Sequence, residues 1–461
     1  MEKTTEPTSM CYTENASEEA DKGGLCLEDC ISGLPDVVLV SILSLLTMKE
    51  AVRTSVLSKS WRYMWTHITH LNFDSSRVIE GIQLEQKKVE VERPFFLGWV
   101  NQVLKSHKAP TIDEFRVHFD FGESYRLDID NWVKFAMEKR VKRLELDLAE
   151  LTHYSREEAN YSIPDLDGIT NHLHSLSLGF TSCNSLTNLL LTYVNVTGQV
   201  LEYFLTNFPN LEQLSVKESD TLVNLKVPDL ALKLKCLEIT FCFYVESIEI
   251  SATNLVSFKY FGPKISLPFK NVQSPADLYI GGDYCFSLIY KFLDISSYLS
   301  KLESLTLHLT SMRKVYLKDA KFPVFNKLKR LKLIVNARDE ESLMDFTFLI
   351  EACPFLSEFV LELRWCGSYR KKKQGRFTSR PHHYLKVVEL IGFVGSINDV
   401  ELAMYLIKSA VNLEKITFDP RHPLHIGRVW EFMETKRKKA ARKRAKKLGK
   451  KLPVGTDLIV L

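Results

Sequence analysis

Residues 302–307 read LESLTL, residues 328–333 read LKRLKL, and residues 356–361 read LSEFVL. In each hexapeptide the first, fourth and sixth residues are apolar. Successive side chains of a strand point to opposite faces, so the fourth and sixth positions share one face. The pattern therefore predicts a short strand with one buried face, repeated three times within sixty residues.

The same hexapeptide recurs along much of the chain, with aliphatic or aromatic substitutes. From Leu186 onward most copies start 21 to 29 residues apart, which is the spacing of leucine-rich repeats. A gap between Leu255 and Leu302 predicts a degenerate copy around Leu278 and Ile280. The copies start at Ile112, Val141, Leu173, Leu186, Leu211, Leu234, Leu255, Leu302, Leu328, Leu356, Leu385 and Leu413.

These copies predict an irregular, curved solenoid of α/β class over residues 110–365, with helix-like returns at 200–208 and 343–350. Each unit exposes an unpaired edge and half a core, so it is stable only when stacked on its neighbours. The leucines are then core residues. The ligand surface is then predicted on solvent-facing residues of the concave strands, from solenoid geometry alone: Glu145, Ser177, Ser215, Thr306 and Lys332.

A helical module is predicted over residues 29–75, before the repeats. Pro35 suits a first helical turn, and apolar residues follow at helical spacing from Leu39 to Leu46. Thr47 and Glu50 have the spacing of a capping box that starts a second helix. Three short helices cannot bury all their large side chains among themselves, so some apolar surface needs a neighbour. That neighbour is either another protein or the next domain of this chain, which the helices would then merely cap.

The residues of this module resemble an F-box of the plant type. The resemblance rests on Leu34-Pro35-Asp36, on Leu39-x-x-Ile42-Leu43, and on the block from Ala51 to Trp65, AVRTSVLSKSWRYMW. Thr47 and Ser60 depart from residues common in that family. The resemblance implies docking on an adaptor of Skp1 type and, through it, on a cullin. The residues that it implies at or behind the adaptor surface are Leu34, Pro35, Leu39, Ile42, Leu43, Leu57 and Trp61.

A strand–helix–strand unit is predicted over residues 380–432. Its blocks LKVVELIGF (385–393) and NLEKITF (412–418) flank an amphipathic helix at 399–411. The unit reads as a final repeat pair that caps the solenoid. These blocks also resemble the FBD domain, which follows the repeats in many plant F-box proteins.

The charge of the chain is unevenly distributed. Eleven Lys or Arg residues and no acid lie between Lys436 and Lys451, so subtracting them from the net +4 leaves −7 for the rest. The tail over 433–461 shows no apolar stripe and is predicted to be exposed. Such runs serve nuclear import or nucleic-acid contacts, and import is favoured because no aromatic residues interleave with the charges. A basic loop at 370–373 is interpreted as a solvated insertion.

Several classes of protein are disfavoured by the sequence. No uncharged apolar run is long enough for a membrane span, and residues 1–28 lack the apolar core of a signal peptide and read as a disordered leader. The nine scattered cysteines show no metal-ligand spacing and fit a reducing compartment, nucleus or cytoplasm. No catalytic motif and no cofactor site is recognised.

The function predicted from these features is substrate recognition in a ubiquitin ligase of SCF type (Skp1–cullin–F-box), without catalysis. The F-box would hold the adaptor and the repeats a protein substrate that the sequence does not identify. An alternative is a repeat scaffold without a ligase role. A third, weaker hypothesis is a protein that contacts nucleic acid through its basic tail.

Overall fold

A computed structural model describes most of the chain. The described residues are 33–59, 61–84, 88–148, 159–164, 184–229, 233–251, 254–265, 275–291, 299, 301–310, 322–337, 342–365, 380–427 and 429–461. Four predictions fall outside them: the leader at 1–28, the repeat copy that starts at Leu173, the candidate Ser177, and the basic loop at 370–373.

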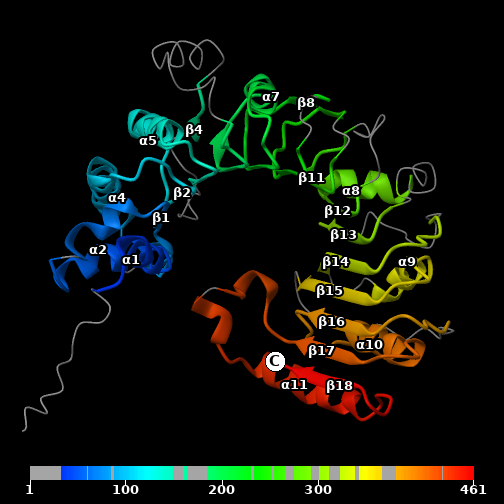
Figure 1. Cartoon of the computed structure of the whole chain (residues 1–461). Coiled ribbons are helices and arrows are strands. Elements are labelled where there is room, and N and C mark those ends of the chain that lie inside the picture. Colours follow the sequence, from blue (N-terminus) through cyan, green and yellow to red (C-terminus); the bar gives the residue numbers. More distant parts are fainter. Residues whose placement is uncertain are drawn as a thin grey trace, which may run out of the picture.

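A 14-stranded sheet forms the body of the protein, and its strands follow one another in chain order, each parallel to its neighbours. Figure 1 shows the sheet curved into an arc, with strands lining the inner side and helices covering the outer side. Its strands are β1 (His70–Asp74), β2 (Glu114–His118), β3 (Arg143–Asp147), β5 (Asn188–Thr192), β7 (Gln213–Lys217), β9 (Cys236–Thr240), β11 (Ser257–Gly262), β12 (Asp277–Gly281), β13 (Ser304–Leu309), β14 (Arg330–Ala337), β15 (Glu358–Trp365), β16 (Val387–Ile391), β17 (Lys415–Asp419) and β18 (Asp457–Val460).

The leucine pattern fixes the register of this sheet. Leu305 pairs with Leu331, which pairs with Phe359, and the next buried position pairs Leu307 with Leu333 and Leu361. All six side chains are buried. The degenerate copy predicted around Leu278 and Ile280 is confirmed as β12, whose Leu278 pairs with Leu305. The repeated pattern therefore builds two continuous apolar rows through the sheet.

The outer layer is irregular, as predicted. It contains helices behind some strands and, behind β7 and β9, a separate two-stranded sheet of β8 and β10. Side-chain caps start several of these helices: Thr197 accepts from Val200 N, and Ser396 accepts from Asp399 N. The remaining strands are β4 (Tyr161–Ser162), β6 (Val194–Asn195), β8 (Asn224–Val227) and β10 (Ser247–Ile250).

Helices begin in the N-terminal module and recur along the outer side of the arc. The α-helices are α1 (Asp36–Leu43), α2 (Met48–Arg53), α3 (Ser76–Gln83), α4 (Val89–Ser106), α5 (Arg126–Glu138), α7 (Gly198–Asn207), α8 (Gly282–Ile289), α9 (Thr347–Glu351), α10 (Ile397–Ser409) and α11 (Lys436–Gly449). The 3-10 helices are η1 (Thr54–Val56), η2 (Trp61–His67), η3 (Glu123–Tyr125), η8 (Leu343–Phe346), η9 (Pro423–His425) and η10 (Val429–Phe432).

The sheet extends beyond the predicted repeats at both ends. β1 lies within the segment assigned to the helical module, and it pairs in register with β2. At the other end the strand–helix–strand unit is confirmed as β16, α10 and β17. It does not close the sheet, because β18 pairs with β17.

The prediction that the basic tail has no apolar stripe is wrong for α11, although most of the basic residues of this helix are exposed, as predicted. Ala441, Ala445 and Leu448 of α11 are buried, and Gly449 lies against Leu458 of β18. Spacings of four and three residues place these side chains on one helix face. This apolar stripe is narrow, and two of its three residues are alanines among many charged residues. A search of the sequence for large apolar residues at helical spacing therefore does not detect it.

Three further features bear on the classes of protein considered. The part of the chain that the structure describes has no helix with the length and hydropathy that a membrane span requires. Within the same residues no group of three or more His, Cys, Asp or Glu could hold a metal ion. The four described cysteines are free thiols, and three of them, Cys242, Cys285 and Cys353, are buried.

Candidate functional site

The helical module turns one face of α1 inward and leaves the other in solvent. Leu39 and Leu43, one turn apart, are buried, and so is Trp61 of η2. The predicted capping box of α2 is confirmed: Thr47 Oγ1 accepts from Glu50 N at 3.3 Å, and the Glu50 carboxylate accepts from Thr47 N at 3.1 Å. The buried side chains and the cap hold the three helical segments in one arrangement.

Contacts with the first repeats hold the module at the end of the sheet. Lys108 N donates to Thr66 O at 2.7 Å. The His107 ring nitrogen Nε2 lies 2.9 Å from Ile68 O, and burial lowers the pKa of His107, so the ring is neutral at physiological pH. The module is therefore joined to β1 and to the residues that follow α4.

The other side of the module is an exposed apolar surface, which we call the module face. Leu45 and Val56 are each 86% exposed and Leu57 is 67% exposed, an unusual concentration of large apolar side chains in solvent. A groove of about 680 Å³ runs between α1 and η2 on the module. The module face comprises Leu34, Val37, Val38, Ile42, Leu45, Leu46, Val56 and Leu57.

The seven residues implied at the adaptor surface divide into two groups. Leu34, Pro35, Ile42 and Leu57 are exposed and belong to or border the module face. Leu39, Leu43 and Trp61 are buried in the chain's own core, so they support the face and cannot touch a partner. Sequence reasoning missed Val37, Leu45 and Val56, because residue type alone does not tell which side of a short helix packs on its neighbours.

The five residues predicted to contact substrate also differ in their surroundings. Glu145 is held by Arg116 at 2.9 Å and by Arg143 at 2.7 Å. Thr306 is half-buried, and Lys332 pairs with Glu362 at 3.0 Å. Ser215 was predicted to face solvent, but it is 1% exposed, because it lies beneath its neighbours and donates to Glu238 at 3.2 Å. Ser177 lies outside the described residues.

A polar network lies around Lys332 on the inner face of the sheet, on β12 to β15. Arg364 donates to Glu362 at 2.8 Å and to His308 Nε2 at 3.2 Å, and His308 Nδ1 lies 2.8 Å from Tyr279 Oη. Burial, together with the charge of Arg364, lowers the pKa of His308 to about 4. The ring is therefore neutral, accepts from Arg364 and donates its Nδ1 hydrogen to Tyr279.

The network carries fixed charges on a partly buried surface. Burial alone would raise the pKa of Glu362, but hydrogen bonds and charge from Lys332 and Arg364 lower it. The carboxylate is therefore ionised between two cations. On the neighbouring side, the ring of Phe261 lies 4.9 Å from that of His308 and stacks on Phe241 at 4.2 Å. Sequence reasoning had identified Lys332 only, because the positions that follow each repeat's last leucine show no shared residue type.

The segment between β17 and α11, residues 420–435, curls into the space enclosed by the arc (Figure 1). Arg421 fixes its base through Asp419 at 2.7 Å and through Glu431. Its η9 packs against β15, with Pro423 next to Gly392. Leu424, Ile426, Phe432 and Met433 are exposed on this segment, which we call the inner loop. Leu424 of η9 thus brings an exposed apolar side chain to β15, the strand that carries Glu362 and Arg364.

Known protein families match the helical module and the repeat sheet separately. Residues 31–70 match the F-box domain family, and residues 103–451 match the family described as At1g61320/AtMIF1, LRR domain. The second match alone spans more than half of the chain. The chain belongs to the F-box/LRR-repeat proteins. It is thus an F-box protein whose repeats mediate protein interactions, in a family that is generally a non-catalytic adaptor class.

Relatives of this F-box/LRR chain occur in Arabidopsis thaliana. The F-box/LRR-repeat protein At3g42770 is 27% identical over 397 residues, which cover 81% of this chain and 71% of the relative. The F-box/LRR-repeat protein At3g03360 is 27% identical over 341 residues, 67% of this chain and 64% of its own length. The FBD-associated F-box protein At4g10400 is 35% identical over 130 residues, 28% of this chain and 29% of the relative.

Proposed function

We propose that this protein is the substrate-recognition subunit of an SCF-type (Skp1–cullin–F-box) ubiquitin ligase. The observation that carries the proposal is the module face: an F-box match whose large apolar side chains are exposed although the module is packed on the sheet. A Skp1-type adaptor covers that face and connects the chain to a cullin. Burying the exposed leucines and valines supplies the affinity.

The repeats hold a protein substrate in this proposal. Support comes from the inner face of the arc, where Lys332, Glu362, Arg364 and His308 form the network. The inner loop packs its η9 against β15 and exposes Phe432. Aromatic residues, Met and Arg are enriched in protein-binding surfaces, whose rims are polar. No cofactor is invoked. The chain contributes proximity between substrate and catalytic assembly, and performs no bond chemistry.

Affinity purification after inhibition of cullin ligases tests both halves of the proposal. Wild-type protein should retain the Skp1-type adaptor, the cullin and a set of substrate proteins. A variant of the inner face, Lys332→Glu with Phe432→Ala, should keep adaptor and cullin and lose substrates, because Lys332 lies on β14, far from the module in the sheet order, and Phe432 lies on the inner loop and not on the module face. Failure of wild-type protein to retain the adaptor, where another F-box protein does, would refute the ligase function.

A repeat scaffold without a ligase role is the second candidate. It is favoured by the same charged inner face, which needs no adaptor to bind a protein. The two candidates differ in one result: a scaffold retains its protein partner but neither adaptor nor cullin, whatever residues occupy the module face.

We propose that residues 380–432 are related to the FBD domain. We also propose that the protein is located in the nucleus or the cytoplasm and that the exposed side of α11 is a nuclear-import signal. Lys446 and Lys447 are exposed, whereas Ala445, on the packed face of α11, is buried. The double substitution Lys446→Gln with Lys447→Gln therefore removes two positive charges without disturbing the packed face of α11. Its location is followed in a fluorescent fusion protein. An unchanged nuclear signal in this variant would exclude the import role of these residues.

A further inference from the structure

A row of aromatic rings crosses the inner face where β9, β11 and β13 end. Phe243 is 58% exposed, and its ring lies 6.4 Å from that of Phe241. Phe241 stacks on Phe261 at 4.2 Å, and Phe261 lies 4.9 Å from His308 of the polar network. Gly281 of β12 permits the last contact, because a Cβ there would clash with the Phe261 ring and lie 3.0 Å from the Cβ of His308. The row therefore continues the surface proposed above for the substrate.

Glu218 follows Phe241 on the next strand. Lys217 of β7 pairs with Thr240 of β9, and Glu218 and Phe241 are the next residues of these two strands. Tyr193 has the same position after β5, and its N–H donates to Lys217 O at 3.0 Å. All three residues have a left-handed φ, between 55° and 60°, and neighbouring strands lie about 4.8 Å apart. The Glu218 side chain therefore lies between the side chains of Tyr193 and Phe241.

The carboxylate of Glu218 lacks the ion pair that stabilises its neighbours. Glu238 of the adjacent strand pairs with Lys217 at 3.0 Å. Within the described part of the chain Glu218 forms no such pair with a Lys, Arg or His, and the charge near it is that of a second acid, Asp220. Burial and the charge of Asp220 raise the pKa of Glu218 to about 7. A half-buried carboxylate in these surroundings gains from a cation that reaches it.

The surroundings of Glu218 favour an arginine side chain over other cations. Aromatic faces attract cations, and the planar guanidinium group stacks on rings while its parallel N–H groups match the two oxygens of a carboxylate. A metal ion needs several ligands, and the described residues contain no group of three or more His, Cys, Asp or Glu that could hold one. Phe243 and Tyr244, which follow Phe241, are exposed and offer apolar contact to the residues around the arginine.

We propose that the rim formed by Tyr193, Glu218 and Phe241 binds an arginine side chain of the substrate protein, a step that rests on the substrate-binding function proposed above. We call these three residues the cation rim. The guanidinium group pairs with the Glu218 carboxylate and lies between the two rings. From there the substrate follows the aromatic row toward the polar network.

Selection of a random peptide library on the full chain tests the cation rim. Peptides retained by wild-type protein are depleted against Glu218→Gln, which keeps the size of the side chain and removes its charge. The remaining peptides should carry an arginine. Citrulline in its place should weaken binding to wild type at least about tenfold, because a charge-assisted pair is lost. The same exchange should change binding to Glu218→Gln by less than about twofold.

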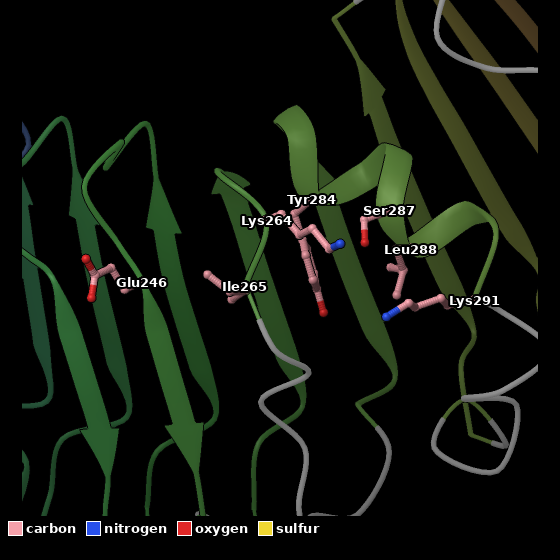
Figure 2. A pocket seen from close by; sticks show the side chains of 7 residues that line it. All are labelled: Glu246, Lys264, Ile265, Tyr284, Ser287, Leu288 and Lys291. Carbon is pink, nitrogen blue, oxygen red and sulfur yellow. The ribbon is translucent and has the colours of Figure 1, made fainter.

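Glu246→Gln is the matched control, because Glu246 is an exposed acid outside the rim, on the connection between β9 and β10. Figure 2 shows its side chain apart from those around α8, so the substitution leaves their contacts intact. This variant should bind the selected peptides like wild type, and melting curves verify that each variant is folded. The affinity of wild type should rise up to about tenfold from pH 6 to pH 8 as Glu218 ionises, and that of Glu218→Gln should not.

Three results would overturn the proposal: no peptide whose binding depends on Glu218, selected peptides without arginine, or an equal loss on citrulline exchange in wild type and Glu218→Gln. Retention of the Skp1-type adaptor is measured on the same preparations. A chain that retains the adaptor but fails these titrations loses the cation rim and keeps the ligase function. A chain that passes them without retaining the adaptor keeps the cation rim as part of a repeat scaffold.

Discussion

Replacing exposed leucines of the module face should abolish adaptor binding while leaving the fold intact. Leu45 and Leu57 are 86% and 67% exposed, so truncation to alanine removes few contacts within the chain. Leucine to alanine deletes three carbons, and a buried methylene contributes about 0.8 kcal/mol. If the adaptor buries each side chain, each change costs about 2 kcal/mol, or about a 30-fold weaker Kd. Together the two changes should weaken binding about 1,000-fold.

The assay is calorimetric or interferometric titration of purified protein with a Skp1-type adaptor, beside a melting curve of each variant. Leu127→Ala is the matched control, because Leu127 is an exposed leucine on α5 outside the module. Leu39→Ala must not be used to map the contact: its side chain is buried, and the cavity it leaves should cost about 2 to 5 kcal/mol of folding free energy. Unchanged affinity in Leu45→Ala with Leu57→Ala, with an unchanged melting temperature, would show that the module face is not the adaptor contact.

Three further predictions concern stability. Ala445→Glu should lower the melting temperature by several degrees because it buries a charge under α11, whereas Lys446→Glu on the exposed side should not; equal melting of the two would mean that α11 is not packed. Burial raises the pKa of Asp399 to about 7. Between about pH 4 and pH 7 the folded chain therefore keeps a proton on this carboxyl that the unfolded chain has lost. The free energy of unfolding should fall as pH rises through that window, by on the order of 4 kcal/mol at most. Asp399→Asn, whose amide oxygen can still accept from Val394 and Gly395, should flatten this dependence, and denaturant unfolding at pH 5 and pH 8 measures it. Gly282→Ala should destabilise the fold by about 1 to 3 kcal/mol, because Gly282 has a φ of +71° and a Cβ there would lie 2.6 Å from Gly262 O. A variant that unfolds at the same denaturant concentration as wild type would contradict this.

Much of the fold was predictable because its main determinant is local and repeated. The hexapeptide places apolar residues two apart on one face, and stacking turns that periodicity directly into the pairing of Leu305 with Leu331 and Phe359. The capping box at Thr47 was readable for the same reason, because both of its hydrogen bonds lie within four residues.

The misses share the opposite property, since they depend on distant partners. β1 has the alternation of Leu71 and Phe73, but it follows the helices so closely that it reads as part of the module. Ser215 is covered by Glu238 of the neighbouring strand. The inward side of α1 is decided by η2, against which the helix packs, so the sequence could not separate Leu39 from Leu45.

The order of the strands has a consequence for how the chain is made. Each strand of the sheet pairs with the strand before it in the chain, so a segment leaving the ribosome finds its partner already synthesised. Among the described strands, the longest stretch of chain between two neighbours in the sheet separates β3 from β5, from Arg143 to Asn188. The sheet can therefore grow one strand at a time during translation. If translation pauses, the strands already synthesised can form a shorter sheet in which the apolar rows are paired.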